Sequence, residues 1–312
     1  MKREDKTVIG VATFRRPAGL LRLLESLECM ETGRNIEIVV AENDAPGLEG
    51  ATAVSSLVQQ GYRWPVAVVF VERRGISEAR NALIEAAFRD PTVVALAMVD
   101  DDQWVEPGWI DALTDMQEAT GATVVGCRVV PDFQGLPGDW TEGLNVFWRE
   151  SKNDGLCELI VGTDGVLLDR TVLNHCKPPY FDPEFSLTGG GDKEFFVRLS
   201  KKGATFAYAG SAIAHEIFGR DRLNVGWACR RAFRIGSTDM RTVLRHYREP
   251  RRLVLELFKI AGALVVTPVS FILLAWSTRL RLKHVMRMCR AFGKISALVG
   301  VRYGEYRRTY GS

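Results

Sequence analysis

Three consecutive aspartates, Asp100–Asp102, are the side chains whose type and spacing point most clearly to chemistry. They follow seven apolar residues, 93–99, which predict a strand buried on both faces, as in a parallel sheet. In an open α/β sheet, ligands bind outside the carboxyl ends of the strands, which is where the triplet falls. Because adjacent carboxylates repel one another and a helix cap needs only one, the triplet indicates a hard cation that bridges phosphates. The alternative is an acidic surface turn before a helix that starts near Pro107.

A glycine triplet, Gly189–Gly191, precedes a second candidate, Asp192. Glycines let a backbone and a ligand approach closely, and the apolar spacing that follows places Asp192 at the N-terminus of a helix. A carboxylate there can cap the helix. Beside a phosphate-binding site it can instead act as a general base on an acceptor hydroxyl.

Three ring-bearing side chains have two interpretations each. His215 ends a predicted strand and is a packed or surface imidazole unless Asp102 recruits it as a metal or pyrophosphate ligand. Trp140 and Trp148 lie in a loop-rich segment, 132–156, where they either stack on a sugar ring or fill a local core.

The elements that must position these residues alternate along the first part of the chain. Apolar runs predict strands at 7–13, 36–41, 66–71 and 92–99, with helices beginning near residues 17, 48 and 77 between them. Four such alternations predict a parallel, three-layer α/β sheet with right-handed crossovers. A helix over 107–120 and a strand over 122–130 extend it.

Each of these strands ends in polar side chains, and their convergence carries more weight than any single motif. The polar ends are Thr13 with Arg15, Glu42 with Asp44, Arg73 with Arg74, and Asp100–Asp102. A nucleoside diphosphate needs an acceptor for its base N–H, cations or a metal for its phosphates, and partners for its ribose. The set supplies all three, whereas the alternative treats each end as a solvated loop.

Charge divides the chain into two parts. Residues 1–218 carry 21 Lys and Arg against 33 Asp and Glu, whereas 219–312 carry 20 against 5. Such a basic segment meets nucleic acid, anionic lipid or an acidic partner. The six scattered cysteines resemble reduced thiols, and no apolar core of a signal peptide follows the first residues. We therefore expect the chemistry to face the cytoplasm.

An uncharged segment of 17 residues, 260–276, favours lipid as the partner of the basic part. Its length is marginal for a membrane span, and Pro268 would kink a helix. Basic residues on both flanks favour a broken or re-entrant helix, followed by a basic amphipathic helix on anionic lipid. Another basic amphipathic helix is expected over 221–246. The alternative is a buried helical hairpin that closes a soluble homodimer.

Several segments resemble glycosyltransferase family 2 in order and spacing. They are GVATFRRP at 10–17, VAEND at 40–44, ISEARN at 76–81, VDDDQW at 99–104 and GGGDKEFF at 189–196. Residues 215–237 are similar to the subgroup that builds bacterial exopolysaccharides, such as the succinoglycan glucosyltransferases. The likeness covers nearly the whole chain, including the apolar tail.

The resemblance implies a GT-A fold, with a Rossmann-like nucleotide-binding sheet, and an inverting transfer from a nucleotide sugar. The family's aspartate pair that meets ribose, metal and diphosphate falls on Asp101 and Asp102, and its catalytic base falls on Asp192. Its uracil-contacting acidic position falls on either Glu42 or Asp44. The family often has Glu-Asp before that helix, whereas this sequence has Gly191 in place of the Glu, so the contact made there is not carried over.

These inferences describe an inverting transferase, dependent on Mg²⁺ or Mn²⁺, that moves a hexose from a UDP-sugar, with UDP-glucose favoured, to a lipid-linked saccharide. It would work at the cytoplasmic face of the plasma membrane, monotopic or re-entrant, and no nucleic-acid partner is expected. Residues 1–218 would form the catalytic domain, 219–250 a basic helical linker and 251–312 a membrane-associating helical tail. The expected nucleotide-binding residues are Thr13, Arg15, Glu42, Asp44, Arg80, Asp100 and Asp101; the metal ligands are Asp102 and His215; and the sugar-contacting residues are Trp140, Trp148, Gly190, Gly191 and Glu194.

Two other functions stay open. A membrane-bound polysaccharide-assembly subunit with little activity would carry a vestigial site, against which the intact Asp100–Asp102 and Asp192 speak. A sugar nucleotidyltransferase would need a glycine-rich basic loop after the first strand, and residues 13–17 lack the glycines.

Overall fold

Four parallel strands at the start of the chain form the half of the sheet that carries the aspartate triplet. The computed structural model describes residues 5–44, 46–247, 249–274 and 276–301. The strands are β1 (Lys6–Thr13), β2 (Asn35–Glu42), β3 (Val66–Phe70) and β4 (Val93–Asp100), in the order β3-β2-β1-β4. This confirms the predicted parallel α/β arrangement. Register places Ala12 of β1 beside Asp100 of β4, so both strands end at the same edge.

The other half of the sheet is mixed. Its strands are β8 (Val166–Asp169), β6 (Val124–Phe133), β9 (Phe206–Phe218), β5 (Gln103–Val105) and β7 (Gly155–Cys157). Strand β8 lies antiparallel between β4 and β6, β9 runs parallel to β6, and β5 and β7 pair antiparallel with β9. The segment predicted as loop-rich contains, besides β7, a short 3₁₀ turn at Asp139–Thr141.

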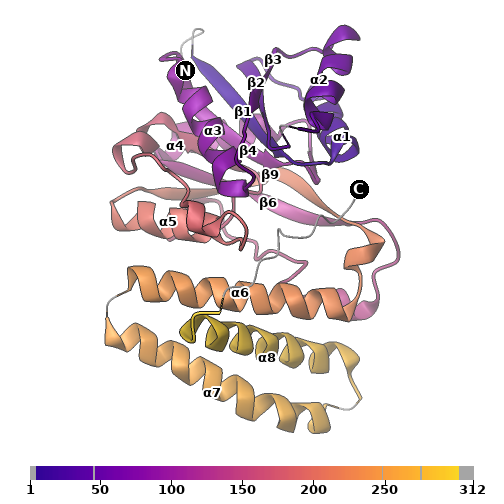
Figure 1. Cartoon of the computed structure of the whole chain (residues 1–312), viewed down its shortest axis with the longest axis vertical. Coiled ribbons are helices and arrows are strands. Elements are labelled where there is room, and N and C mark those ends of the chain that lie inside the picture. The colour runs from indigo at the N-terminus through magenta and orange to yellow at the C-terminus, as the bar shows by residue number, and fades with distance from the viewer. Residues whose placement is uncertain (1–4, 45, 248, 275, 302–312) are drawn as a thin grey trace.

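Helices cover both faces of the sheet, as the apolar periodicity predicts (Figure 1). On one face lie α1 (Pro17–Glu28), α2 (Glu49–Gln59) and α4 (Trp109–Thr120), which share a core with alternate residues of β1, β2 and β4. On the other lie α3 (Ile76–Arg89) and α5 (Gly191–Lys201), whose Leu83, Phe195 and Phe196 are buried. Strand β4 therefore packs on both faces, which explains its uninterrupted apolar run.

Three long helices lie to one side of this body (Figure 1). They are α6 (Val225–His246), α7 (Pro250–Leu273) and α8 (Thr278–Leu298). Helix α6 lies next to the sheet, α8 packs against α6, and α7 packs against α8 as the outermost element.

The structure corrects the expectation of a broken helix at 260–276, because α7 continues through Pro268. A proline removes only one donor from the helical ladder, and neighbouring contacts hold this turn. The Ser270 hydroxyl donates to the Thr267 carbonyl, and the Thr267 hydroxyl donates to the His284 carbonyl on α8. These contacts stabilise the turn around Pro268 and connect it to α8, so the helix continues.

Helix α7 has its polar and apolar faces reversed relative to a helix of a water-soluble protein. The buried face carries Glu256, Thr267 and Ser270, whereas Phe258 is 71% exposed and Ile272 is 76% exposed. Among the described residues, α7 is the one helix long and apolar enough to cross a membrane. An exposed apolar surface of this kind marks a face that another apolar phase or partner covers.

Helices α6 and α8 touch through their backbones at two glycines. A Cβ atom built at Gly236 would overlap the Arg290 carbonyl, and one built at Gly293 would overlap the Phe233 carbonyl. Neither backbone can move aside as a side chain can. The two glycines therefore set the distance between α6 and α8.

We expect Gly236→Ala to lower the free energy of unfolding by about 1–3 kcal/mol, the usual cost of overpacking. Thermal unfolding of the full-length protein in detergent measures it. Gly262→Ala is the matched control, because a Cβ at Gly262 on α7 meets nothing within 4 Å. Equal melting temperatures for the two variants would contradict the proposed backbone contact.

Candidate functional site

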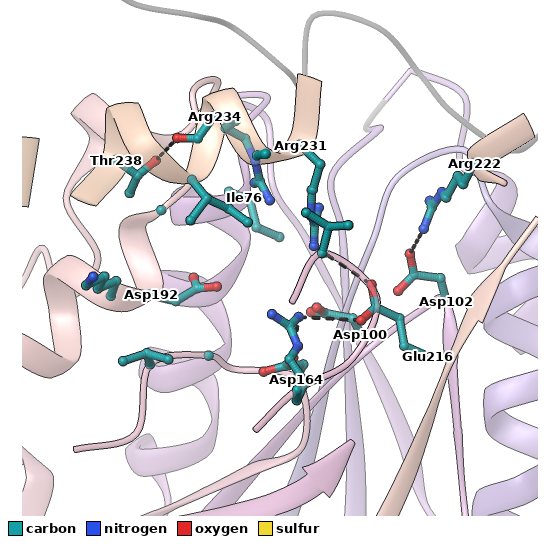
Figure 2. Close-up of a pocket in the computed structure, with 18 of the residues that line it drawn as sticks. Ile76, Asp100, Asp102, Asp164, Asp192, Glu216, Arg222, Arg231, Arg234 and Thr238 are labelled. Atoms are coloured by element: carbon teal, nitrogen blue, oxygen red, sulfur yellow. Dashed lines mark hydrogen bonds and ion pairs between the residues drawn. The ribbon is translucent and has the colours of Figure 1, made fainter. Parts of the chain in front are cut away.

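A cavity of about 500 Å³ lies between the carboxyl ends of β1 and β4 and the helices α6 and α8 (Figure 2). Carboxylates line its floor: Asp100, Asp102, Asp164, Asp192 and Glu216. Cations line its roof: Arg231 and Arg234 from α6, and Lys283, Arg287 and Arg290 from α8. The cavity therefore places carboxylates from strand ends, a loop and α5 opposite basic side chains from the C-terminal helices.

The three aspartates of the triplet face different partners. Asp101 is the most buried of them, and accepts hydrogen bonds from the Thr13 hydroxyl at 2.9 Å and from Arg16 at 3.2 Å. Asp102 pairs with Arg16 and with Arg222, each at 3.1 Å. Thr13, Asp101 and Asp102, all predicted site residues, are thus brought together at the cavity.

Asp100 and Asp192 are joined by one arginine. The guanidinium of Arg80, on α3, pairs with Asp100 at 3.2 Å and with Asp192. Arg80 is only 5% exposed, so both contacts are made in a poorly solvated place. The sequence prediction that Arg80 belongs to the site is consistent with this position, although its contacts here are to carboxylates.

The glycine triplet brings Asp192 to the cavity. Gly190 precedes α5 with a φ of +83°, and a Cβ there would overlap Thr238 of α6. Gly191 begins α5 against Phe185, and Asp192 follows as the second residue of the helix. Asp192 makes no capping hydrogen bond, since the α5 cap uses no side chain. Its carboxylate instead lines the cavity and pairs with Arg80.

Burial of this acidic cluster shifts its pKa values. Desolvation, together with the carboxylates of Asp102 and Asp192, raises the pKa of Asp100 to about 7 despite Arg80. Desolvation likewise raises the pKa of Asp101 to about 6. Burial acts the same way on Asp102, but Arg222 and Arg16 outweigh it and lower the pKa of Asp102. The raised pKa values of Asp100 and Asp101 thus come first from burial, and the arginines offset that effect fully only at Asp102.

A second ion-pair network, absent from the sequence prediction, completes the floor. Arg149 pairs with Asp164 at 2.6 Å and with Glu216 at 3.4 Å, and Arg231 approaches Glu216 at 3.8 Å. Desolvation raises the pKa of Glu216, against the opposing effect of Arg149 and Arg231. These residues come from segments far apart in the sequence, so no local motif identifies them. The sequence offered one indication of this network: Glu216 is adjacent to His215, which was already a candidate at the end of a strand.

The structure places His215 away from Asp102, which corrects its assignment as a metal ligand. Alternate residues of a strand face opposite sides, so Glu216 enters the cavity and His215 does not. The His215 ring stacks on Trp104 with centroids 3.7 Å apart, and its Nε2 lies 3.1 Å from Glu106.

Glu42 and Asp44, the two alternatives for a base contact, line no part of the cavity. Glu42 is fully buried and accepts hydrogen bonds from the backbone N–H groups of Asp44 and Ala51. Asp44 pairs with Arg15 at 2.7 Å, and Arg15 has a left-handed backbone conformation (φ 53°). Instead Asn43, between the two acids, lines the cavity. The three predicted residues support the loop rather than face the cavity.

Trp140, Trp148 and Glu194 also lie outside the cavity lining. Trp140 packs edge-on against Phe147, in the small core under the insertion, and Trp148 meets Phe133 in the same way. Glu194 is 1% exposed and pairs with Arg198 and His246. The core interpretation fits Trp140, whereas Trp148 is 38% exposed and makes only this edge contact among the described residues. Glu194 joins α5 to α6.

The residues present fit a divalent cation that arrives with a phosphate ligand. Within the described ranges, no group of three or more His, Cys, Asp or Glu side chains stands in position to hold a metal by itself. Mg²⁺, however, usually takes one or two carboxylates together with substrate phosphates. Asp100 and Asp102 face the cavity with 34% and 25% of their side chains exposed. They are the carboxylates that would hold the ion.

Known proteins of similar sequence and fold agree with this architecture. The chain is 29% identical to the succinoglycan biosynthesis protein ExoM of Rhizobium meliloti (strain 1021), over 75% of this chain and 74% of ExoM. Two solved structures share the fold. The mannosyltransferase PcManGT of Pyrobaculum calidifontis, in complex with GDP-Man and Mn²⁺, has a TM-score of 0.64 at 15% identity, covering 94% of this chain and 86% of that one. TarS of S. aureus, in complex with UDP, has a TM-score of 0.51 at 13% identity, covering 96% and 93%.

The family model described as glycosyl transferase family 2 matches residues 8–166, from β1 to the start of β8. This match spans half of the chain and includes the aspartate triplet and Arg80. The chain therefore belongs to glycosyl transferase family 2.

Proposed function

We propose that this glycosyltransferase moves a hexose, with inversion, from a UDP-sugar to a lipid-linked saccharide in the synthesis of a bacterial exopolysaccharide. UDP-glucose is the favoured donor. The observation that carries the proposal is the pair of carboxylate centres, Asp192 and the triplet Asp100–Asp102, that face one cavity and share Arg80. An inverting transfer requires a base that directs the acceptor to the face of the sugar opposite the departing diphosphate.

The roles follow from position. Asp192 takes the proton from the acceptor hydroxyl, while Arg80 fixes the direction of its carboxylate. Figure 2 shows Asp192 and the Asp102–Arg222 pair at opposite sides of the cavity. Arg16 and Arg222 lie where the departing diphosphate would collect charge, and stabilise it. A divalent cation bound by Asp100 and Asp102 would supply further neutralisation of that diphosphate.

The similar proteins support the choice of substrates. TarS was solved with UDP and with UDP-GlcNAc, and PcManGT with GDP-Man and Mn²⁺. ExoM is a succinoglycan biosynthesis protein. These names support a nucleotide-sugar donor, a divalent metal and an exopolysaccharide product for this chain. A screen of nucleotide-sugar donors, with UDP release as the readout, identifies the sugar that is transferred.

We expect Asp192→Asn to lower kcat by about 10²–10⁴-fold, because the amide cannot take the acceptor proton. Donor affinity should stay near that of the wild type. UDP release with membranes or lipid extract as the acceptor source measures kcat, and calorimetry with UDP measures the affinity. Asp139→Asn, an exposed aspartate outside the cavity, is the control. An Asp192→Asn enzyme that keeps more than about a tenth of wild-type turnover would exclude the base assignment.

Metal dependence is tested by calorimetry with UDP, in the presence of Mn²⁺ or of EDTA. We expect chelation to abolish tight UDP binding, and Asp102→Asn to weaken the metal-dependent part by about 10–100-fold or more. Asp139→Asn again serves as the control. UDP binding that is equally tight in EDTA would remove the metal from the proposal. An absence of any UDP binding would favour the assembly-subunit alternative.

We also propose that the chain consists of three functional segments. Residues 1–218 form the catalytic domain, 219–250 a basic helical linker and 251–312 a membrane-associating tail, of which 302–312 lie outside the described residues. The reversed polarity of α7 supports membrane association, since its apolar face is uncovered by the rest of the chain that the structure describes. The basic α8 suits the cytoplasmic, anionic surface of the bilayer.

Ile272→Glu should shift the protein from the membrane fraction toward the soluble fraction, because it places a carboxylate on the apolar face of α7. Leu136→Glu is the matched control, since Leu136 is 99% exposed on the catalytic domain. Sedimentation of lysates without detergent gives the two fractions. A wild-type protein that stays soluble without lipid would disprove the membrane proposal.

A further inference from the structure

A second cavity, of about 460 Å³, lies between α7 and α8. Its lining is both cationic and apolar, with Lys259, His284 and Lys294 beside Ile260, Ala263 and Val266. Arg287 and Arg290 line this cavity and also line the catalytic cavity. The two arginines therefore stand at the boundary between the site of the reaction and the membrane-facing helix.

Four cations form a ridge along α8. Lys283, Arg287, Arg290 and Lys294 are spaced by four, three and four residues, which places them on one face of the helix. Like charges at this spacing destabilise a helix, and α8 contains no Asp or Glu to compensate them. The ridge thus depends on negative charge from elsewhere.

Only part of that charge comes from neighbouring helices. Glu256 on α7 pairs with Lys294 and also with Lys259. Asp239 on α6 pairs with Arg290 at 2.9 Å and also with Lys193. Each of the two acids is therefore shared between two cations.

Arg287 and Lys283 are the two cations of the ridge that these acids do not neutralise. Neither makes a hydrogen bond or an ion pair with any residue in the described parts of the chain. Burial, with the charges of Arg287 and Lys283, lowers the pKa of His284, as expected beside uncompensated positive charge. Both side chains are exposed, so the boundary between the two cavities offers positive charge to an anion that the described parts of the chain do not supply.

The apolar half of the second cavity limits what that anion can be. Ile260, Ala263 and Val266 belong to α7, whose opposite face is the exposed apolar surface described above. A free phosphate would make no contact with these three apolar residues. An apolar chain that carries phosphoryl groups would contact both the apolar residues and the cations.

We infer that the groove between α7 and α8 binds a lipid phosphate, with its phosphoryl groups on Arg287 and Arg290 and its apolar chain along α7. The role of this groove rests on the proposed function. A saccharide attached to the phosphoryl group would extend past Arg287 and Arg290 into the catalytic cavity. Asp192 lines that cavity, so the acceptor hydroxyl would be presented from the side of the membrane.

The test measures binding of full-length protein to phosphatidylcholine vesicles that contain geranylgeranyl diphosphate. Vesicles of equal surface charge that contain phosphatidylglycerol give the reference, and the ratio of the two affinities is the quantity compared. We expect the wild type to prefer the diphosphate vesicles by about tenfold or more, as charge-assisted hydrogen bonds typically allow.

Arg287→Gln should bring this ratio to about one, because it removes the unpaired cation at the boundary. Arg251→Gln, an exposed arginine of α7 that lines neither cavity, removes the same charge and should keep the wild-type ratio. Thermal unfolding of both variants checks that each is folded.

Three results would overturn the inference: a wild type without the preference, an Arg287→Gln variant that keeps it, or equally strong competition by inorganic pyrophosphate. The last result would indicate a site for free phosphate instead. UDP release by the wild type tests the proposed function separately. If no donor gives UDP but the Arg287-dependent preference remains, the transferase proposal fails and the lipid phosphate site stands.

Discussion

The buried guanidinium of Arg80 is the interaction on which the site depends. It is itself only 5% exposed, and it pairs with Asp192 of α5 and Asp100 of β4, whose side chains are partly exposed to the cavity. Removing both carboxylates would leave a buried guanidinium uncompensated, which is more costly than a lost surface ion pair. Arg80 therefore links α5 to the sheet and sets the separation of Asp192, the proposed base, from Asp100 and the rest of the triplet, the proposed diphosphate region.

The site is a layer of charge between two apolar layers. On one side, the core of the sheet keeps the ends of β1 and β4 rigid. On the other, the helices α6 and α8 contribute arginines while their far side packs against α7. The cavity therefore offers both carboxylates and guanidinium groups, so the proposed diphosphate and its cation would each meet opposite charge there. Such compensation lowers the cost of burying charged groups.

Much of the fold was predictable, because buried parallel strands are continuous apolar runs and the chain alternates them with amphipathic helices. The triplet Asp100–Asp102 and Asp192 were predictable for a related reason, since each stands where a regular element begins or ends. His215 was misplaced because a one-residue shift along a strand reverses the face of a side chain. Arg149, Arg222 and Arg231 were missed because only tertiary packing brings them to the acids. Glu42 and Asp44 show the converse, since acidic residues at a strand end can serve the loop itself.

The reversed polarity of α7 bears on what holds the C-terminal helices together. In hydrocarbon, the hydrophobic effect no longer drives apolar helices toward one another, so cohesion must come from close backbone packing and polar contacts. The glycine contacts between α6 and α8, and the Glu256–Lys294 and Thr267–His284 contacts between α7 and α8, are of this kind. The sheet, in contrast, is held by burial of apolar surface away from water. One chain therefore combines a sheet held by burial of apolar surface with three helices that also have backbone and polar contacts, the kind of cohesion that does not require water around it.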